Sequence, residues 1–236
     1  MVYPNQAVEA ARYMNGSIQE NPEIDGLLGL GFRRLNRVVP VAQNTFFDNI
    51  LPSLAAPLFV SALRFNAPGS YDFGLIDSKK YKGKLAYTDV NDTPGYWHIY
   101  VTGSSMSKTT GFYTIVDSGT TLILIDDALV DAYYAKVTGA VKDDTSGGYF
   151  FPCKTTLPDL WFMLGGAKQV VPGAYMNLPG SVGEGNNSTM CYGGVQSNGG
   201  GQSINVLGNV FMKGKYIVHD HANGYPRMGF APLTQP

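Results

Sequence analysis

Short runs of alternating apolar and polar residues, separated by glycine and proline, dominate the chain. Such runs are typical of half-buried β-strands, because the side chains of a strand point alternately to its two faces. A turn is predicted at 67–70, where Ala-Pro-Gly-Ser interrupts the pattern. The predicted strands cover residues 24–32, 58–65, 71–76, 84–88, 96–101, 112–116, 121–125, 216–218 and 227–230. The pattern therefore predicts an all-β protein.

Two segments have the features of short helices. In 45–54, Thr45 stands before an apolar stretch as a helix-capping residue and Pro52 interrupts the stretch. In 126–137, two aspartates precede apolar residues that recur every three or four positions. The apolar stripe of this second helix is predicted to be Leu129, Ala132, Tyr133 and Val137.

Composition is consistent with a globular β protein and excludes several kinds of partner. The chain has 236 residues, of which 44% are hydrophobic and 12% aromatic, so it is long and apolar enough to bury a core. The formal net charge is -1, so the chain lacks the excess of positive charge that is typical of proteins that bind nucleic acid or an anionic membrane. No apolar run reaches the length of a membrane span. We therefore expect no nucleic-acid partner and no membrane partner.

A weak internal sequence similarity suggests two related lobes. Leu28-Gly29 and Leu207-Gly208 are both apolar-Gly steps set in apolar segments, each after a turn. We place the first lobe at residues 1–85 and the second at 86–236.

The most informative sequence is Val-Asp-Ser-Gly-Thr-Thr at 116–121, which follows one predicted strand and enters the next. With the apolar exit strand and the later Leu207-Gly208 step, it resembles the active-site segment of a pepsin-like aspartic protease. The resemblance implies that the strand with the Leu207-Gly208 step crosses beneath the loop that carries the aspartate. The chain resembles the fungal branch of this family, which includes endothiapepsin and penicillopepsin. Further matching segments cover nearly the whole chain: 24–30, 45–49, 71–74, 122–127, 157–159 and 228–232.

The resemblance implies a bilobal acid-protease fold and a role for each residue of the motif. Asp117 would hold the nucleophilic water as one half of a pair of aspartates. Ser118 would direct its hydroxyl toward the opposite lobe, and Gly119 would let backbone and substrate approach. Thr120 and Thr121 would hydrogen-bond near the substrate, although Thr121 also suits a β-branched strand position.

The resemblance also predicts what these residues lack. The reaction needs two carboxylates that share a proton, one as base and one as acid. No other aspartate here is followed by Ser or Thr and then Gly. By the resemblance, the family's first Asp-Thr-Gly and its flap hairpin lie before Met1. We therefore expect a partial amino-terminal lobe followed by a complete carboxy-terminal lobe, and a missing segment or partner that covers the open lobe.

Three functions follow from this pattern. The first is a secreted aspartic endopeptidase that acts on peptides or proteins, whose sequence here is incomplete and which alone is inactive. The second is a catalytically dead pseudoprotease that binds a peptide or protein. The third is an enzyme that uses Asp117 as a lone general acid or base.

Secretory features accompany the resemblance, although the polar residues that follow Met1 predict no signal peptide there. The only two cysteines, Cys153 and Cys191, correspond to the family's second-lobe disulfide, while a redox-active pair is the alternative. Four glycosylation acceptor sequences begin at Asn15, Asn91, Asn186 and Asn187. Together these features favour an oxidising, extracellular location.

Neither a metal nor a cofactor is expected. His219 and His221 share one face of a predicted strand, but a third ligand would have to come from far along the chain. No glycine-rich phosphate loop is present, because the glycines near residue 29 precede no Lys-Ser or Lys-Thr.

Overall fold

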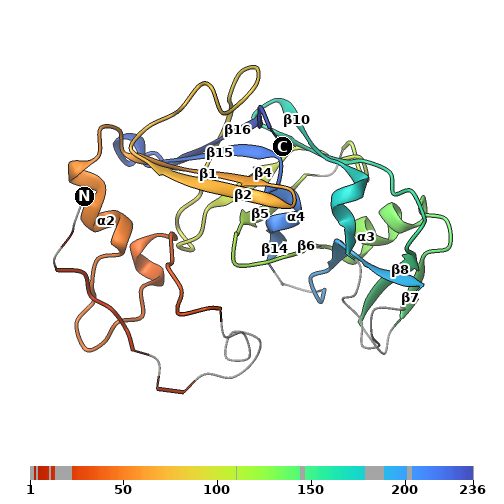
Figure 1. The fold of residues 1–236 in the computed structure, drawn as a ribbon, viewed down its shortest axis with the longest axis horizontal. Coiled ribbons are helices and arrows are strands. Elements are labelled where there is room, and N and C mark those ends of the chain that lie inside the picture. Colours follow the sequence, from red (N-terminus) through yellow and green to blue (C-terminus); the bar gives the residue numbers. More distant parts are fainter. Residues whose placement is uncertain are drawn as a thin grey trace.

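The fold consists mainly of short β-strands with a few short helices (Figure 1). The computed structural model describes residues 3, 5–10, 12–13, 23–109, 111–143, 147–178, 189–200 and 204–235. The predicted all-β fold class is confirmed. No helix in these ranges is long and apolar enough to cross a membrane.

One antiparallel sheet joins segments from both ends of the chain. Its order is β2 (Ala67–Phe73), β1 (Leu58–Arg64), β15 (Lys215–Asp220), β16 (Arg227–Pro232) and β3 (Ala86–Asp89). The strands β1, β2, β15 and β16 lie together in the upper part of Figure 1. The lobe boundary proposed at residue 85 therefore falls between two strands, β2 and β3, of a single sheet.

A second five-stranded sheet carries the segment of interest. Its order is β13 (Val195–Ser197), β6 (Ile123–Ile125), β14 (Asn205–Leu207), β5 (Phe112–Val116) and β4 (His98–Val101). The central strand β14 runs parallel to β5 and antiparallel to β6. This insertion of β14 between β5 and β6 fixes the geometry of the loop that joins them.

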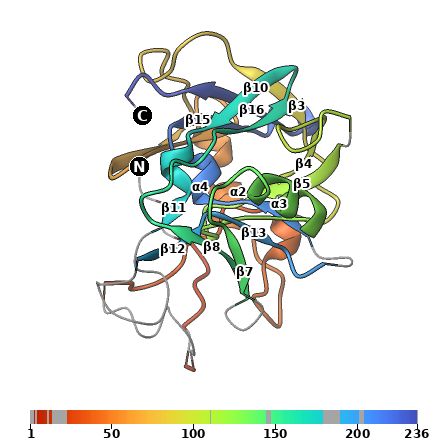
Figure 2. The ribbon, with the colours of Figure 1, turned by 90° about the vertical axis from the view of Figure 1, so that its right-hand side faces the viewer.

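The remaining elements flank these two sheets (Figure 2). A four-stranded sheet consists of β11 (Asn177–Leu178), β12 (Met190–Gly193), β8 (Gly148–Pro152) and β7 (Val141–Asp143), and β9 (Leu160–Leu164) pairs with β10 (Ala167–Val171). The helices are α2 (Phe46–Ile50), α3 (Asp127–Tyr134) and α4 (Asn209–Met212), with 3-10 turns at Arg33–Leu35, Leu51–Ser53, Gly173–Met176 and Ala222–Gly224.

Both predicted helices form, but one differs in length and in its buried face. Thr45 caps α2 through a reciprocal pair of hydrogen bonds with Asp48, as its position predicts. Asp126 caps α3, which ends at Tyr134 rather than at Val137. Val130 and Tyr134 are buried, whereas Leu129 and Ala132 are only half-buried. Tyr133 and Val137 of the predicted stripe are buried and Leu129 packs against the core, so the stripe is wrong only in omitting Val130 and Tyr134 and in including Ala132. Tyr134 is buried because its hydroxyl donates to the Val195 carbonyl of β13 at 2.8 Å.

Two local predictions are corrected by the structure. Residues 24–32 form no strand, and the side chains of Leu27 and Leu28 are 81% and 63% exposed. A strand needs a neighbour to satisfy its backbone groups, and none of the described strands pairs with this segment.

The turn predicted at 67–70 belongs instead to β2, and the chain reverses at Phe65 and Asn66, where Asn66 has a φ of 50°. Pro68 is tolerated in β2 because this strand lies at the edge of its sheet.

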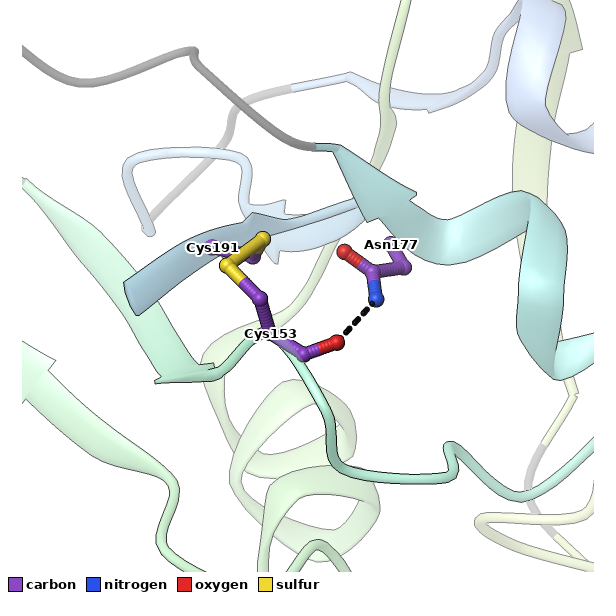
Figure 3. Close-up of a disulfide and its surroundings, with 3 residues drawn as sticks. All are labelled: Cys153, Asn177 and Cys191. Atoms are coloured by element: carbon purple, nitrogen blue, oxygen red, sulfur yellow. Dashed lines mark hydrogen bonds between the residues drawn. A yellow bond between two sulfur atoms is a disulfide. The ribbon is translucent and has the colours of Figure 1, made fainter. Parts of the chain in front are cut away.

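The disulfide predicted by the resemblance is present. Cys153 and Cys191 are bonded across a sequence separation of 38 residues, and Cys191 is buried beside β8 (Figure 3). The Asn177 side chain donates a hydrogen bond of 2.9 Å to the Cys153 carbonyl. This contact fixes β11 next to the cross-link.

Replacing both cysteines by alanine is expected to lower the free energy of unfolding by about 3 kcal/mol, because the open loop gains entropy in the unfolded chain. Urea unfolding at neutral pH measures the change. The unsubstituted chain in a reducing agent serves as the control and should unfold at the same urea concentration as the variant. A loss below about 1 kcal/mol would show that the cross-link constrains the unfolded chain little.

Candidate functional site

The loop from Asp117 to Leu122 lies where β5 ends and β6 begins. Both flanking strands are anchored in the core, since Val116 is 6% exposed and Ile123 is fully buried. β14 separates β5 from β6, so the loop has to pass over the end of β14. A short loop held at both ends in this way presents its side chains in a fixed position.

The Asp117 carboxylate is held by two hydrogen bonds from its own loop. Oδ1 accepts the backbone N–H of Gly119 at 2.8 Å, and Oδ2 accepts the Thr120 hydroxyl at 2.7 Å. Its backbone N–H donates to the Leu207 carbonyl at 3.2 Å, which ties Asp117 to β14. Asp117 itself remains half-buried. The carboxylate is therefore oriented and still partly accessible, as a group that acts on a bound water requires.

The chain that leaves β14 supports the loop from below. The backbone N–H groups of Gly208, Asn209 and Val210 donate to the carbonyls of Leu122, Thr120 and Thr121 at 3.1, 2.7 and 3.0 Å, respectively. The Asn209 side chain adds a bond of 3.0 Å from its Nδ2 to the Ser118 carbonyl. These four bonds lock the loop onto residues far away in the sequence.

Gly208 is required at this crossing because the two backbones approach closely. A Cβ atom at position 208 would lie 2.3 Å from both the Leu122 and the Thr120 carbonyl oxygens. The Gly208→Ala variant is expected to lose about 2 kcal/mol of unfolding free energy, since relieving the overlap stretches the supporting hydrogen bonds. Chemical unfolding measures this loss.

Gly29→Ala is the matched control, because Gly29 lies in the other apolar-Gly step and a Cβ there meets nothing within 4 Å. This control should change the stability by less than about 0.5 kcal/mol. Equal stabilities for the two variants would contradict the importance of the close crossing at Gly208.

The structure brings the five predicted site residues together in one loop, but they differ in exposure. Ser118, Gly119 and Thr121 are exposed, while Asp117 and Thr120 are half-buried. Thr121 lies before the start of β6 at Ile123, so it is not a strand residue. Thr120 binds the carboxylate directly, which the sequence pattern did not indicate.

Asn209 is the residue that the sequence analysis missed. Its side chain reaches the Ser118 carbonyl, and the only sequence signal is its position directly after the Leu207-Gly208 step. The family resemblance places the Leu207-Gly208 step beneath the loop at 116–121, as the structure shows, but it does not indicate the contact made by Asn209.

The two neighbouring histidines pack into an aromatic cluster. The His219 ring stacks on Phe59 with 4.2 Å between ring centroids, and both His219 and His221 lie 4.9 Å from Trp97. Burial lowers the pKa of His219 to about 3 and also lowers the pKa of His221. Among the described residues, no group of three or more His, Cys, Asp or Glu is placed to hold a metal.

Of the glycosylation acceptor sequences, only the one at Asn91 can be placed as a whole. Asn91 is exposed, and its side-chain oxygen accepts the backbone N–H of Thr93 at 3.1 Å. Asn15, Asn186 and Asn187 lie outside the described residues.

Comparison with known proteins supports the family resemblance. A family profile described as "Eukaryotic aspartyl protease" matches residues 1–233. Aspergillopepsin-1 of Aspergillus flavus is 46% identical over 233 residues, which are 96% of this chain and 55% of that protein. Penicillopepsin-1 of Talaromyces stipitatus is 44% identical over 230 residues, which are 96% of this chain and 57% of that protein. The chain therefore spans little more than half the length of these relatives.

A solved structure agrees with the sequence matches. The crystal structure of an aspartic proteinase from Irpex lacteus superposes with a TM-score of 0.73 at 27% identity. The match covers 91% of this chain and 70% of that one. The similarity thus extends over almost the whole chain.

Proposed function

Because the chain belongs to the eukaryotic aspartyl protease family, we propose that it contributes Asp117 to an aspartic endopeptidase. Such an enzyme hydrolyses peptide bonds with an activated water. The observation that carries the proposal is the Asp117 carboxylate, oriented by Gly119 and Thr120 while still partly accessible. Such a carboxylate can accept a proton from a water molecule that attacks a peptide carbonyl.

Hydrolysis by this route needs a second carboxylate. As the water loses its proton to one carboxylate, the other donates a proton to the carbonyl oxygen, so no covalent intermediate forms. Two close carboxylates share one proton because they cannot both ionise easily. These 236 residues contain no second Asp followed by Ser or Thr and then Gly. We propose that the partner carboxylate comes from polypeptide outside them, and that the chain alone does not hydrolyse peptides.

We assign the other loop residues to substrate contact. Ser118 and Thr121 are exposed and offer hydroxyl groups on the loop that carries Asp117. Gly119 is exposed and has no side chain to obstruct an approaching peptide. Thr120 keeps the carboxylate oriented through its bond to Oδ2.

A covering segment or partner is proposed for the side formed by residues 23–32. Leu27 and Leu28 are exposed there, and burying two leucines would contribute about 3–5 kcal/mol to association. We propose that this segment belongs to a partial amino-terminal lobe, residues 1–85, and that residues 86–236 form the carboxy-terminal lobe.

An extracellular location is proposed for the whole protein. The Cys153–Cys191 disulfide persists in an oxidising compartment, and the exposed Asn91 can accept a glycan there. Family membership supports the same location.

A peptide-binding module without activity is the second candidate. The single Asp-Ser-Gly sequence favours it, since an exposed loop can bind a peptide without a second carboxylate. Binding of a peptide without cleavage, even when a second carboxylate is supplied, would distinguish this function from proteolysis.

Supplying the second carboxylate tests the proposed reaction. An amino-terminal segment of a fungal relative that contains Asp-Thr-Gly is fused ahead of Met1, and the fusion is incubated with a denatured protein over a range of pH. We expect cleavage fastest at acid pH, where one carboxylate of the pair is protonated, with new amino termini found by mass spectrometry. Folded fusion protein that cleaves nothing at acid pH would contradict the proposal.

A further inference from the structure

A pocket unrelated to the Asp117 loop lies between the β1–β2 hairpin and the carboxy-terminal segment. It has a volume of about 360 Å³, and no residue of the loop at 116–122 lines it. Its lining residues fall into two groups, an apolar wall of Ala62, Pro68 and Leu233, and a polar side that includes Arg64, Ser70, Lys79 and Lys80.

Hydrogen bonds fix the walls of this pocket. Thr234 donates its backbone N–H to the Lys80 carbonyl and its hydroxyl to the Lys79 carbonyl, each at 2.9 Å. Leu233 donates its N–H to the Gly214 carbonyl at 2.9 Å. Arg64 stands at the end of β1 and pairs with Ala67 of β2. The pocket is therefore preformed rather than assembled around a ligand.

The positive charge in the pocket is only partly neutralised. Lys80 is paired with Asp72, whose two carboxylate oxygens lie 2.8 and 2.6 Å from Nζ. Arg64 and Lys79 form no ion pair among the described residues, and the lining includes no Asp or Glu. The Arg64 Nε atom is buried and has no hydrogen-bond partner in the described part of the chain. The rest of the guanidinium lines the pocket without an ion pair to any described residue, and such a planar cation is suited to bind an anionic acceptor there.

Further features restrict the class of ligand. Ser70 accepts a hydrogen bond from Lys80 at 2.9 Å, which leaves its own O–H able to donate. The apolar wall offers contact to carbon, and the volume exceeds what a single inorganic anion fills. From this arrangement we propose that the pocket binds a small organic dicarboxylate, with one carboxylate on Arg64 and the other on Lys79. The proposal is independent of the peptidase function.

Calorimetric titration of the 236-residue chain with succinate tests the proposal. The titration is carried out at low ionic strength. We expect saturable binding with a Kd of about 1 mM or tighter, and none with the neutral analogue succinamide. Arg64→Met, which keeps the aliphatic stem, should weaken binding at least about tenfold. Arg37→Met removes an exposed arginine that does not line the pocket, and should bind succinate as the unsubstituted chain does.

Lys79→Met is a second variant in case Arg64→Met unfolds, because the Lys79 side chain is exposed. It should weaken binding about threefold or more. The proposal is overturned by absence of saturable binding, by equal binding of succinamide, by unchanged affinity in folded pocket variants, or by tighter binding of inorganic phosphate than of succinate.

Discussion

Asp117→Asn is expected to lower peptide hydrolysis by about 10⁴-fold in kcat when a second carboxylate is supplied by the fusion described above. The amide cannot accept a proton from water, so the attacking nucleophile is no longer generated. The substitution should leave the loop folded, because the Asn oxygen can still accept the Gly119 N–H that now binds Oδ1. The Asn amide can in turn donate to the Thr120 hydroxyl oxygen, which lies 2.7 Å from Oδ2.

The measurement is steady-state hydrolysis of one peptide at acid pH, with KM and kcat determined separately. We expect KM to change little, since the variant keeps the shape of the loop. Asp89→Asn is the matched control, because Asp89 is exposed in β3. This substitution makes the same chemical change at a position away from the loop. A folded Asp117→Asn variant that retains the rate of this control would show that Asp117 is not the proton acceptor.

On acidification from neutral pH to about pH 3, the unsubstituted chain is expected to lose about 4 kcal/mol more unfolding free energy than the His219→Phe variant. Burial lowers the pKa of His219 from 6.5 to about 3, while the unfolded chain titrates near 6.5. Below pH 6.5 the unfolded chain therefore binds a proton that the folded chain cannot bind. The stability that neutral His219 provides is present above pH 6.5 and is lost as the pH falls toward 3.

The surroundings of His219 explain why its charged form is so unfavourable. Phe59 stacks on the ring and Trp97 packs edge-on, and neither carries a charge. His221 is the only charged neighbour that acts on it, and its proton would repel. The Nδ1 atom is buried without a partner in the described residues. Backbone hydrogen bonds with Ile217 and Phe59 favour the charged ring, but desolvation outweighs them. The Phe variant loses these bonds at every pH, so the test compares the change in stability on acidification.

Urea unfolding of both proteins at neutral and at acid pH checks this expectation. His98→Phe is the matched control, because His98 is less buried and packs beside the exposed Tyr113. Carboxylates that titrate over the same range affect all variants alike. If His219→Phe loses as much stability on acidification as the unsubstituted chain, His219 does not determine the acid sensitivity.

Much of the fold was readable from local sequence because its signals are local. Strand alternation predicted β5 at the residues where the structure has it, and Thr45 was recognisable as a helix cap. Residues 24–32 were misassigned, since an apolar segment becomes a strand only when a neighbour pairs with it. The turn at Asn66 was missed because the Pro-Gly pair at 68–69 is normally a stronger turn signal.

The family resemblance predicted the site residues and the crossing of the Leu207-Gly208 step beneath them, but not the individual contacts that support the loop. Asp117 and the residues after it form a recognisable sequence, and they do lie in one loop. The bonds from Asn209 and Gly208 depend on the insertion of β14 between β5 and β6. No local pattern encodes a crossing between segments so far apart. The stacking of His219 on Phe59 was hidden for the same reason.

The central claim is that Asp117 hydrolyses peptides only together with a second carboxylate from outside these residues. The most direct test compares initial rates of hydrolysis of one peptide at acid pH by three proteins: the chain alone, the fusion that carries Asp-Thr-Gly, and the same fusion with that added Asp changed to Asn. The account predicts hydrolysis by the fusion and none by the other two. Equal hydrolysis by all three proteins would contradict it.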